Sequence, residues 1–151
     1  MIRSAQPAEM DLVRELFREY AASLGADWVN AHPCLASFER ELETLPGGYS
    51  TIMIAFDAGQ PAGCVALRKI GDGIGEMKRL YVRPSFQGRR LGRLLVERIV
   101  MEARAAGFQL LRLDTLRTLE RAIGLYRRTG FREIAAYSDN PPEAICFELA
   151  L

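Results

Sequence analysis

The 151-residue sequence predicts an α/β protein in which helices cover both faces of a mixed sheet. The first observation is that β-prone runs alternate with stretches whose apolar residues recur every three or four positions. The second is that one long helical stretch, from about Arg90 to Gly107, separates two β-prone runs. A helical crossover of this length places its flanking strands parallel, whereas the short glycine-containing turns before it are typical of antiparallel hairpins.

Proline and glycine residues indicate where the predicted helices and strands begin and end. Pro7 suits the first turn of a helix, and Gly25 suits the C-terminal cap of that helix. In order, the predicted elements are a strand at 2–5, a helix from Pro7 to about Gly25, an irregular segment at 27–33, a helix at 35–45, strands at 49–56, 63–69 and 74–82, a helix from about Arg90 to Gly107, a strand at 110–115, a helix at 119–128, a return to the sheet at 130–131 and a last strand at 144–149.

Length and composition indicate one globular domain. A chain of this length buries roughly 70% of its unfolded surface. The formal net charge of +1 argues against a general nucleic-acid or membrane-surface binder. With no apolar run of about 18 residues and no signal peptide, we expect a cytoplasmic protein. Cys34, Cys64 and Cys146 are few and scattered, so we expect reduced thiols and neither a disulfide framework nor a metal site.

The segment from Arg79 to Arg93 predicts a strand, a glycine-bearing turn and a helix. The strand stops at Pro84, which cannot donate a sheet hydrogen bond, and Gly88 lies in the turn. Because a helix N-terminus presents unpaired amides and partial positive charge, this turn is a candidate site for a phosphorylated ligand. The alternative is an ordinary strand-to-helix connection on an arginine-rich helix.

Other phosphate-binding motifs are absent or incomplete. The pattern GxxxxGK[ST] of a nucleotide-hydrolysing P-loop does not occur. Gly71, Gly73 and Gly75 alternate, but Glu76 stands where a dinucleotide fingerprint needs its third glycine, so these glycines favour a hairpin turn.

The order V-x-P-x-x-Q-G-R-R-L-G, from Val82 to Gly92, resembles the acetyl-CoA signature [QR]-x-x-G-x-[GA] of the GNAT superfamily of N-acetyltransferases. Arg90 replaces the middle glycine, which is compatible with the motif if residue 90 has helical dihedrals. Downstream, residues 122–131 resemble the A-x-x-L-Y-x-x-x-G-F segment of that family. The resemblance covers roughly residues 50–135.

For the fold, this resemblance implies a mixed, mostly antiparallel sheet of six to seven strands with splayed central strands. Residues 1–48 would form the acceptor side, 49–135 the acetyl-CoA core and 136–151 a C-terminal loop and strand. Acetyl-CoA would be the co-substrate, with its pantetheine arm in the gap between the strands and its pyrophosphate at the turn. The residues expected to bind it are Leu80, Tyr81, Val82, Gln87, Gly88, Arg89, Arg90, Leu91, Gly92 and Arg93, with a solvated helix face as the alternative for Arg93.

For the chemistry, the resemblance implies acetyl transfer to the amine of a small molecule or peptide. Tyr126 occupies the position of the acid that protonates the leaving thiolate, with a core aromatic as the alternative. A carboxylate is needed to deprotonate the amine, and we predict Glu76, which the two-residue period of a strand puts in phase with Lys78, Leu80 and Val82. Asp114 is the second candidate, and an ion pair with Lys78, Arg79 or Arg68 is the alternative role for Glu76.

Acceptor contacts are predicted for Trp28, His32, Asp114 and Tyr137. The alternative for Trp28 is packing beneath its loop, and for His32 a place on the surface. Leu119 replaces an asparagine of the family, so one side-chain contact to the pantetheine arm is lost or made elsewhere. We expect no metal, no nucleic acid and no membrane partner, and the resemblance makes a homodimer plausible. The rival functions are a non-catalytic acyl-CoA sensor and a phosphate-binding domain for nucleotides.

Overall fold

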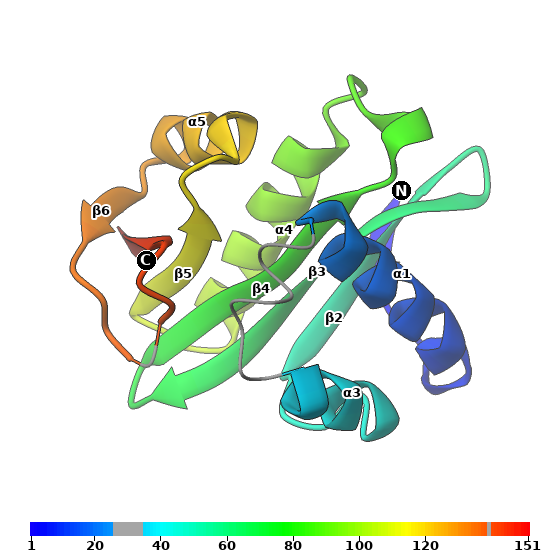
Figure 1. Cartoon of the computed structure of the whole chain (residues 1–151), viewed down its shortest axis with the longest axis horizontal. Helices are drawn as coiled ribbons and strands as arrows, with labels where there is room; N and C mark the ends of the chain where they lie inside the picture. The colour runs from blue at the N-terminus through cyan, green and yellow to red at the C-terminus, as the bar shows by residue number, and fades with distance from the viewer. Residues whose placement is uncertain (26–34, 139) are drawn as a thin grey trace.

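The computed structural model describes residues 1–25, 35–138 and 140–151. The helices and strands of these residues follow the predicted order (Figure 1). They are β1 (Ile2–Ser4), the 3-10 helix η1 (Pro7–Glu9), α1 (Met10–Ser23), α3 (Leu35–Glu43), β2 (Thr51–Asp57), β3 (Gln60–Gly71), β4 (Ile74–Val82), the 3-10 helix η2 (Pro84–Phe86), α4 (Leu91–Ala105), β5 (Leu110–Leu116), α5 (Glu120–Thr129), β6 (Arg132–Ile134) and β7 (Ala144–Ala150).

The strands form a seven-stranded sheet in the order β1-β2-β3-β4-β5-β7-β6. Neighbouring strands are antiparallel except β4 and β5, which are parallel because α4 crosses over between them. The predicted mixed, mostly antiparallel sheet is confirmed, and so is the parallel pair on either side of the long helix.

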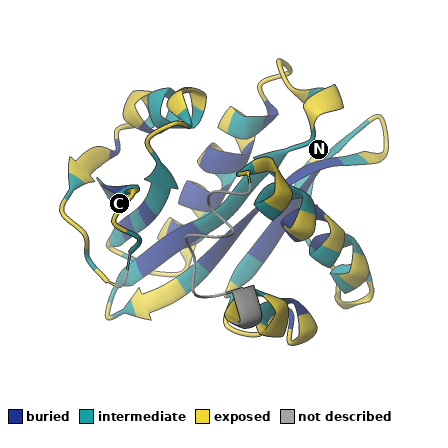
Figure 2. Ribbon diagram, viewed as in Figure 1, coloured by how far each residue is buried: buried dark blue, intermediate teal, exposed yellow. Residues whose placement is uncertain are grey.

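Helices cover both faces of the sheet, as predicted. Because successive side chains of a strand point to opposite faces, β3 directs Val65 and Leu67 toward α4 and α5, and Cys64 and Ala66 toward α1 and α3. Each face therefore has its own apolar core, and Figure 2 shows the buried segments running along the middle strands.

The strands β4 and β5 are paired at one end only. Their register joins Ile74–Glu76 to Leu110–Arg112, yet β4 continues to Val82 and β5 to Leu116. Beyond this short pairing the two strands diverge, so the predicted splay is confirmed. Among the described residues, the part of β4 beyond Glu76 therefore has no strand partner on the β5 side, in the middle of the sheet.

A β-bulge interrupts β4 close to the splay. Ala66 pairs with Lys78 and Cys64 pairs with Tyr81, so β4 has one more residue than β3 between these pairs. Arg79 lies in this bulge with a φ of 60°, in the left-handed region. Because of this extra residue, each later side chain of β4 points to the face opposite to the one that regular alternation would give it.

The bulge makes one sequence prediction wrong. We expected Glu76 to be in phase with Leu80 and Val82, but Glu76 and Lys78 lie on the face of α1 and α3, whereas Leu80 and Val82 pack on the opposite core. The reason is the added residue, since a shift of one position moves every later side chain to the other face.

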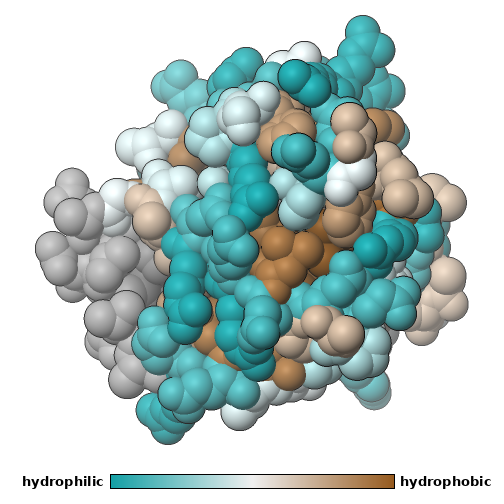
Figure 3. Space-filling model, turned by 90° about the vertical axis from the view of Figure 1, so that its right-hand side faces the viewer, coloured by the Kyte–Doolittle hydropathy of each residue, from teal (hydrophilic) through white to brown (hydrophobic). Residues whose placement is uncertain are grey.

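Among the described residues, no helix is long and apolar enough to cross a membrane. Hydrophilic side chains cover much of the face in Figure 3, and a band of apolar side chains is visible between them.

Candidate active site

A groove of about 1010 Å³ runs between the end of β4, the N-terminus of α4 and one side of α5. It contains most of the residues that the sequence predicts to bind acetyl-CoA. These are Leu80, Tyr81, Val82, Gln87, Gly88, Arg90, Leu91, Gly92 and Arg93. Arg89 is absent from the lining, because its guanidinium forms an ion pair with Asp57 and lies over the ring of Phe86. Arg93 lines the groove while it also pairs with Glu97 on the next turn of α4 (2.8 Å).

The turn before α4 offers a row of unpaired donors. The backbone N–H groups of residues 88–93 form no hydrogen bond to the rest of the described chain, and the first bond of this helix runs from the N–H of Leu94 to the carbonyl of Arg90 (3.1 Å). Residues 87–90 are exposed. These amides and the helix dipole form an anion site at the end of the groove.

Arg90 lies at the N-cap of α4 with φ 63° and ψ 13°. Right-handed helical dihedrals, the condition under which the sequence analysis found a side chain at residue 90 compatible with the motif, are therefore not present. The backbone at this position is left-handed, a conformation that glycine adopts without the steric cost of a Cβ atom. Arg90 thus keeps the backbone geometry that favours glycine and adds a cation at the anion site.

The free edge of β4 lines the same groove. Arg83 donates its backbone N–H to the carbonyl of Ala62 on β3 (2.8 Å). Since hydrogen-bonding groups alternate in direction along a strand, Leu80 and Val82 direct theirs away from β3, toward the gap. One of these groups is occupied, because the side-chain amide of Gln87 donates to the carbonyl of Val82 (3.3 Å).

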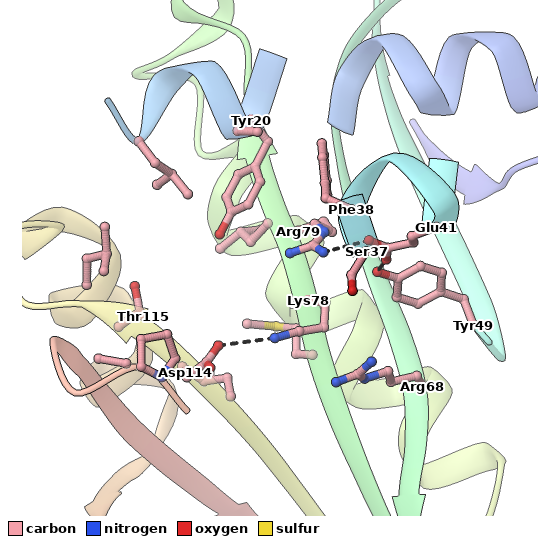
Figure 4. Close-up of a pocket in the computed structure, with 18 of the residues that line it drawn as sticks. Tyr20, Ser37, Phe38, Glu41, Tyr49, Arg68, Lys78, Arg79, Asp114 and Thr115 are labelled. Atoms are coloured by element: carbon pink, nitrogen blue, oxygen red, sulfur yellow. Dashed lines mark hydrogen bonds and ion pairs between the residues drawn. The ribbon is translucent and has the colours of Figure 1, made fainter. Parts of the chain in front are cut away.

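A second pocket of about 740 Å³ lies on the side of the sheet that α1 and α3 cover. It shares Leu80 and Ala122 with the groove, so the two spaces meet where β4 and β5 diverge. Figure 4 shows the side chains that enter the pocket from α1, α3, β3, β4 and β5. Its volume suits a small molecule or a short side chain.

Tyr126 of α5 lines this pocket and is 5% exposed. Its ring packs on Phe131 and Phe147, at centroid distances of 5.9 and 6.1 Å, so the residue also belongs to the core. Burial raises the pKa of Tyr126 above its ordinary value of 10. The phenol is therefore protonated at neutral pH, and its hydroxyl has no hydrogen-bond partner among the described residues.

Asp114 of β5 lines the pocket and accepts hydrogen bonds from Lys78 Nζ (3.3 Å) and Asn140 Nδ2 (2.9 Å). Burial alone raises the pKa of this carboxyl. The charge of Lys78 and the two hydrogen bonds outweigh burial, and the net pKa lies below its ordinary value of 3.8. Asp114 is thus an anion at neutral pH.

Glu76 is placed differently from the prediction. It is 2% exposed, is not among the residues that line either space, and accepts a hydrogen bond from Arg68 Nε (2.7 Å). Lys78 Nζ lies 3.8 Å from the same carboxylate oxygen, and the hydroxyl of Tyr137 donates to the other one. Tyr137, predicted to touch the acceptor, thus contacts Glu76 and is likewise outside the pocket lining.

Two predicted acceptor contacts, Trp28 and His32, lie outside the described residues. The loop that carries Tyr137 does reach the pocket, through Pro141 and Ala144. Sequence reasoning missed five pocket residues, which have no shared motif and come together only in the fold: Phe38, Glu41, Arg68, Lys78 and Arg79. The only signal in the sequence was the consecutive pair of cations at 78–79.

Cys64 and Cys146 are free and buried. Burial raises the pKa of Cys64 to about 12, and its thiol donates to the carbonyl of Arg79 (3.3 Å). A thiol in this state is a poor nucleophile. Among the described residues, no group of three or more His, Cys, Asp or Glu side chains is arranged to hold a metal ion.

Comparison of the sequence and the structure with known proteins identifies the family of this chain. Residues 11–131 match the model of the acetyltransferase (GNAT) family. The uncharacterized N-acetyltransferase C1271.07c of Schizosaccharomyces pombe is 36% identical over 150 residues, which cover 96% of this chain and 90% of that protein. The IAA acetyltransferase of Azospirillum brasilense is 33% identical over 136 residues, covering 89% of this chain and 86% of that protein.

A solved structure agrees on the fold. The structure of yncA from Salmonella typhimurium with its cofactor acetyl-CoA superimposes with a TM-score of 0.77 at 21% identity, covering 99% of this chain and 92% of that one. The chain belongs to the GNAT family of acetyltransferases.

Proposed function

We propose that this protein transfers an acetyl group from acetyl-CoA to a primary amine by direct attack while both substrates are bound. The observation that carries the proposal is the meeting of the two spaces at the splay. The groove ends at an anion site of unpaired amides, the pocket has room for a small acceptor, and Leu80 and Ala122 line both.

The groove fits acetyl-CoA in charge and in hydrogen-bonding capacity. Residues 88–93 would hold the pyrophosphate through their amides, with Arg90 and Arg93 beside them. The backbone groups that Leu80 and Val82 direct into the gap would hold the polar pantetheine arm as a neighbouring strand does. When bound, acetyl-CoA supplies a thioester whose C–S bond breaks as the C–N bond of the product amide forms, releasing the CoA thiol.

The acceptor nitrogen must be neutral to attack, and an alkylamine with a pKa near 10.4 is mostly protonated at pH 7. We assign the general base to Asp114, the carboxylate that lines the pocket, acting directly or through a water. The contacts of Glu76 with Arg68, Lys78 and Tyr137 support the alternative role, that of a buried structural charge.

Tyr126 supports the other proton transfer. Tyr126 lines the pocket, and its hydroxyl is protonated and has no competing partner among the described residues, so it is suited to protonate the departing thiolate. The buried, protonated thiol of Cys64 favours direct attack by the amine over transfer through an acetylated cysteine.

The test is release of free thiol from acetyl-CoA in the presence of a panel of primary amines, with acetyl-CoA binding measured separately. We expect amine-dependent thiol release and an acetylated product of the expected mass. Tight binding without release for any amine would overturn the proposal and favour an acyl-CoA sensor.

A further inference from the structure

The β4 bulge places two consecutive cations in one pocket. In a regular strand Lys78 and Arg79 would point to opposite faces, but both line the acceptor pocket. Arg68 enters the same space from the neighbouring strand β3, and Figure 4 shows the three side chains gathered on one wall. This wall faces the side of the splay that β5 and Asp114 form.

The guanidinium of Arg79 is held in place and has unused donors. Its Nη2 donates to Glu41 Oε2 (2.7 Å), and its planar group lies over the rings of Phe38 (5.2 Å) and Tyr20 (5.9 Å). Neither Nε nor Nη1 forms a hydrogen bond to a described residue, and Nε is buried. Because Nε is buried, Nη1 is the unused donor through which the guanidinium can bind an incoming oxygen acceptor.

The carboxylates of the pocket, in contrast, are already paired. Among the described residues that line it, the acids and their cations are Glu41 with Arg79, Asp114 with Lys78, and Glu39 with Arg18. Arg68 is paired through Nε with Glu76, outside the lining, and its side chain is 43% exposed. A ligand carboxylate therefore finds unused donors here, whereas a ligand with positive charge alone must compete with an existing ion pair.

From this arrangement we infer that the acceptor is a small amine that also carries a carboxylate, bound by Arg79 with Arg68 beside it. The inference rests on the proposed acetyl transfer and names its substrate class. A guanidinium and a carboxylate match in geometry as well as charge. The apolar body of the ligand would lie on Tyr20, Phe38 and Leu116, which line the pocket around the cations.

The test compares three amines that share the side chain of leucine: leucine carries a carboxylate, leucinamide carries a neutral amide in its place, and isoamylamine carries neither. Binding to the CoA-loaded protein is measured by calorimetry, and turnover by thiol release. We expect leucine to bind roughly tenfold or more tightly than either of the others. The amide is a stringent comparison, because its amino group is less basic and more of it is neutral. The inference is overturned if leucinamide or isoamylamine binds as tightly as leucine, or if leucine does not bind.

Variants of Arg79 test whether this residue binds the ligand carboxylate. Arg79→Met is expected to abolish the preference for leucine while acetyl-CoA binding stays unchanged. Arg112→Met is the matched control, because Arg112, like Arg79, pairs with a carboxylate (Glu148, 2.8 Å) and lies over an aromatic ring (Tyr137, 5.3 Å), but it does not line the pocket. If Arg79→Met does not fold, Arg79→Lys keeps the charge without the planar fork and should weaken leucine binding selectively. A preference that survives both changes overturns the role of Arg79.

Different results would contradict the acetyl transfer and the carboxylate-bearing acceptor. Leucine binding without thiol release contradicts acetyl transfer to this amine but supports the carboxylate contact. Thiol release that is faster with isoamylamine than with leucine, together with weaker leucine binding, supports acetyl transfer and overturns the substrate class.

Discussion

The backbone of Gly63 in β3 packs directly against that of Tyr81 in β4: a Cβ atom on residue 63 would lie 2.4 Å from the carbonyl oxygen of Tyr81. Only a residue without a side chain lets β4 follow β3 at this point, where the other edge of β4 faces the splay.

We therefore expect Gly63→Ala to lower the free energy of unfolding by about 1–3 kcal/mol, because the added methyl group forces the two strands apart. Acetyl-CoA binding should weaken as well, since Leu80 and Val82 move with the strand. Gly48→Ala is the control, because its Cβ would meet no atom within 4 Å. Denaturant unfolding and calorimetry measure both effects, and equal stability of the two variants would contradict the prediction.

The left-handed backbone of Arg90 gives a second prediction. Arg90→Gly and Arg90→Ala remove the same charge, but only glycine adopts a φ of 63° without steric cost. The glycine variant should be more stable than the alanine variant by about 1 kcal/mol in denaturant unfolding. Both should bind acetyl-CoA equally, and more weakly than the unaltered protein. An alanine variant as stable as the glycine variant would show that this backbone relaxes.

The substitution Tyr126→Phe distinguishes the two roles considered for this residue, the acid that protonates the thiolate and an aromatic residue of the core. Because the hydroxyl has no partner among the described residues, its loss should leave stability and acetyl-CoA binding unchanged. Turnover should fall by at least roughly tenfold if the phenol protonates the thiolate. Tyr137→Phe is the comparison, since it removes a hydroxyl that donates to buried Glu76 and should lower the melting temperature. Undiminished turnover in Tyr126→Phe would eliminate the acid role.

Asp114 and Glu76, the two carboxylates beside Lys78, are expected to have different roles, general base and structural charge, and their variants should therefore differ in turnover and in stability. Asp114→Asn should reduce turnover roughly tenfold to a hundredfold, and the remaining rate should climb with pH as more acceptor becomes neutral. Glu76→Gln should instead destabilise the fold by about 1–3 kcal/mol, because Arg68 and Lys78 lose a buried anion, and leave the shape of the pH profile unchanged. The reverse pattern would move the base to Glu76.

Glu9 provides a prediction about acid stability. It accepts hydrogen bonds from both terminal nitrogens of Arg3 (2.7 and 2.9 Å) and from the backbone N–H of Gln6 (2.8 Å). The Arg3 bonds, followed by the Gln6 bond, lower the pKa of Glu9 from 4.5 to about 2. A lowered pKa stabilises the folded state above pH 4.5, and this contribution is lost as pH falls toward 2. The melting temperatures of wild type and Glu9→Gln should therefore converge over that range, and parallel curves would contradict the pairing.

Much of the architecture follows from local patterns in the sequence. Apolar residues at helical spacing, such as Val13, Leu16 and Phe17, and glycines in tight turns, such as Gly59, identified the elements in order. The parallel pairing of β4 and β5 followed from the helix between them. These features depend on residues close together in the chain.

The pocket between α1, α3 and the splay could not be predicted from the sequence, because its geometry depends on a bulge that has no local sequence signal. Nothing in Lys78-Arg79-Leu80 distinguishes a bulge from a continuous strand, and a positive φ is uncommon for arginine. The side of the sheet that Glu76 faces was therefore predicted wrongly relative to Leu80. The ion pair of Arg79 with Glu41 joins positions 38 residues apart, a distance over which periodicity gives no information.

The bulge also constrains how this chain tolerates insertions and deletions. A single-residue deletion between Lys78 and Tyr81 would restore regular alternation, and side chains now directed at the groove would exchange places with those now packed beneath α1. Substitutions here change one contact each, whereas a change of length rearranges both the groove and the pocket at once. We thus expect the number of residues in this segment to tolerate less variation than their identity.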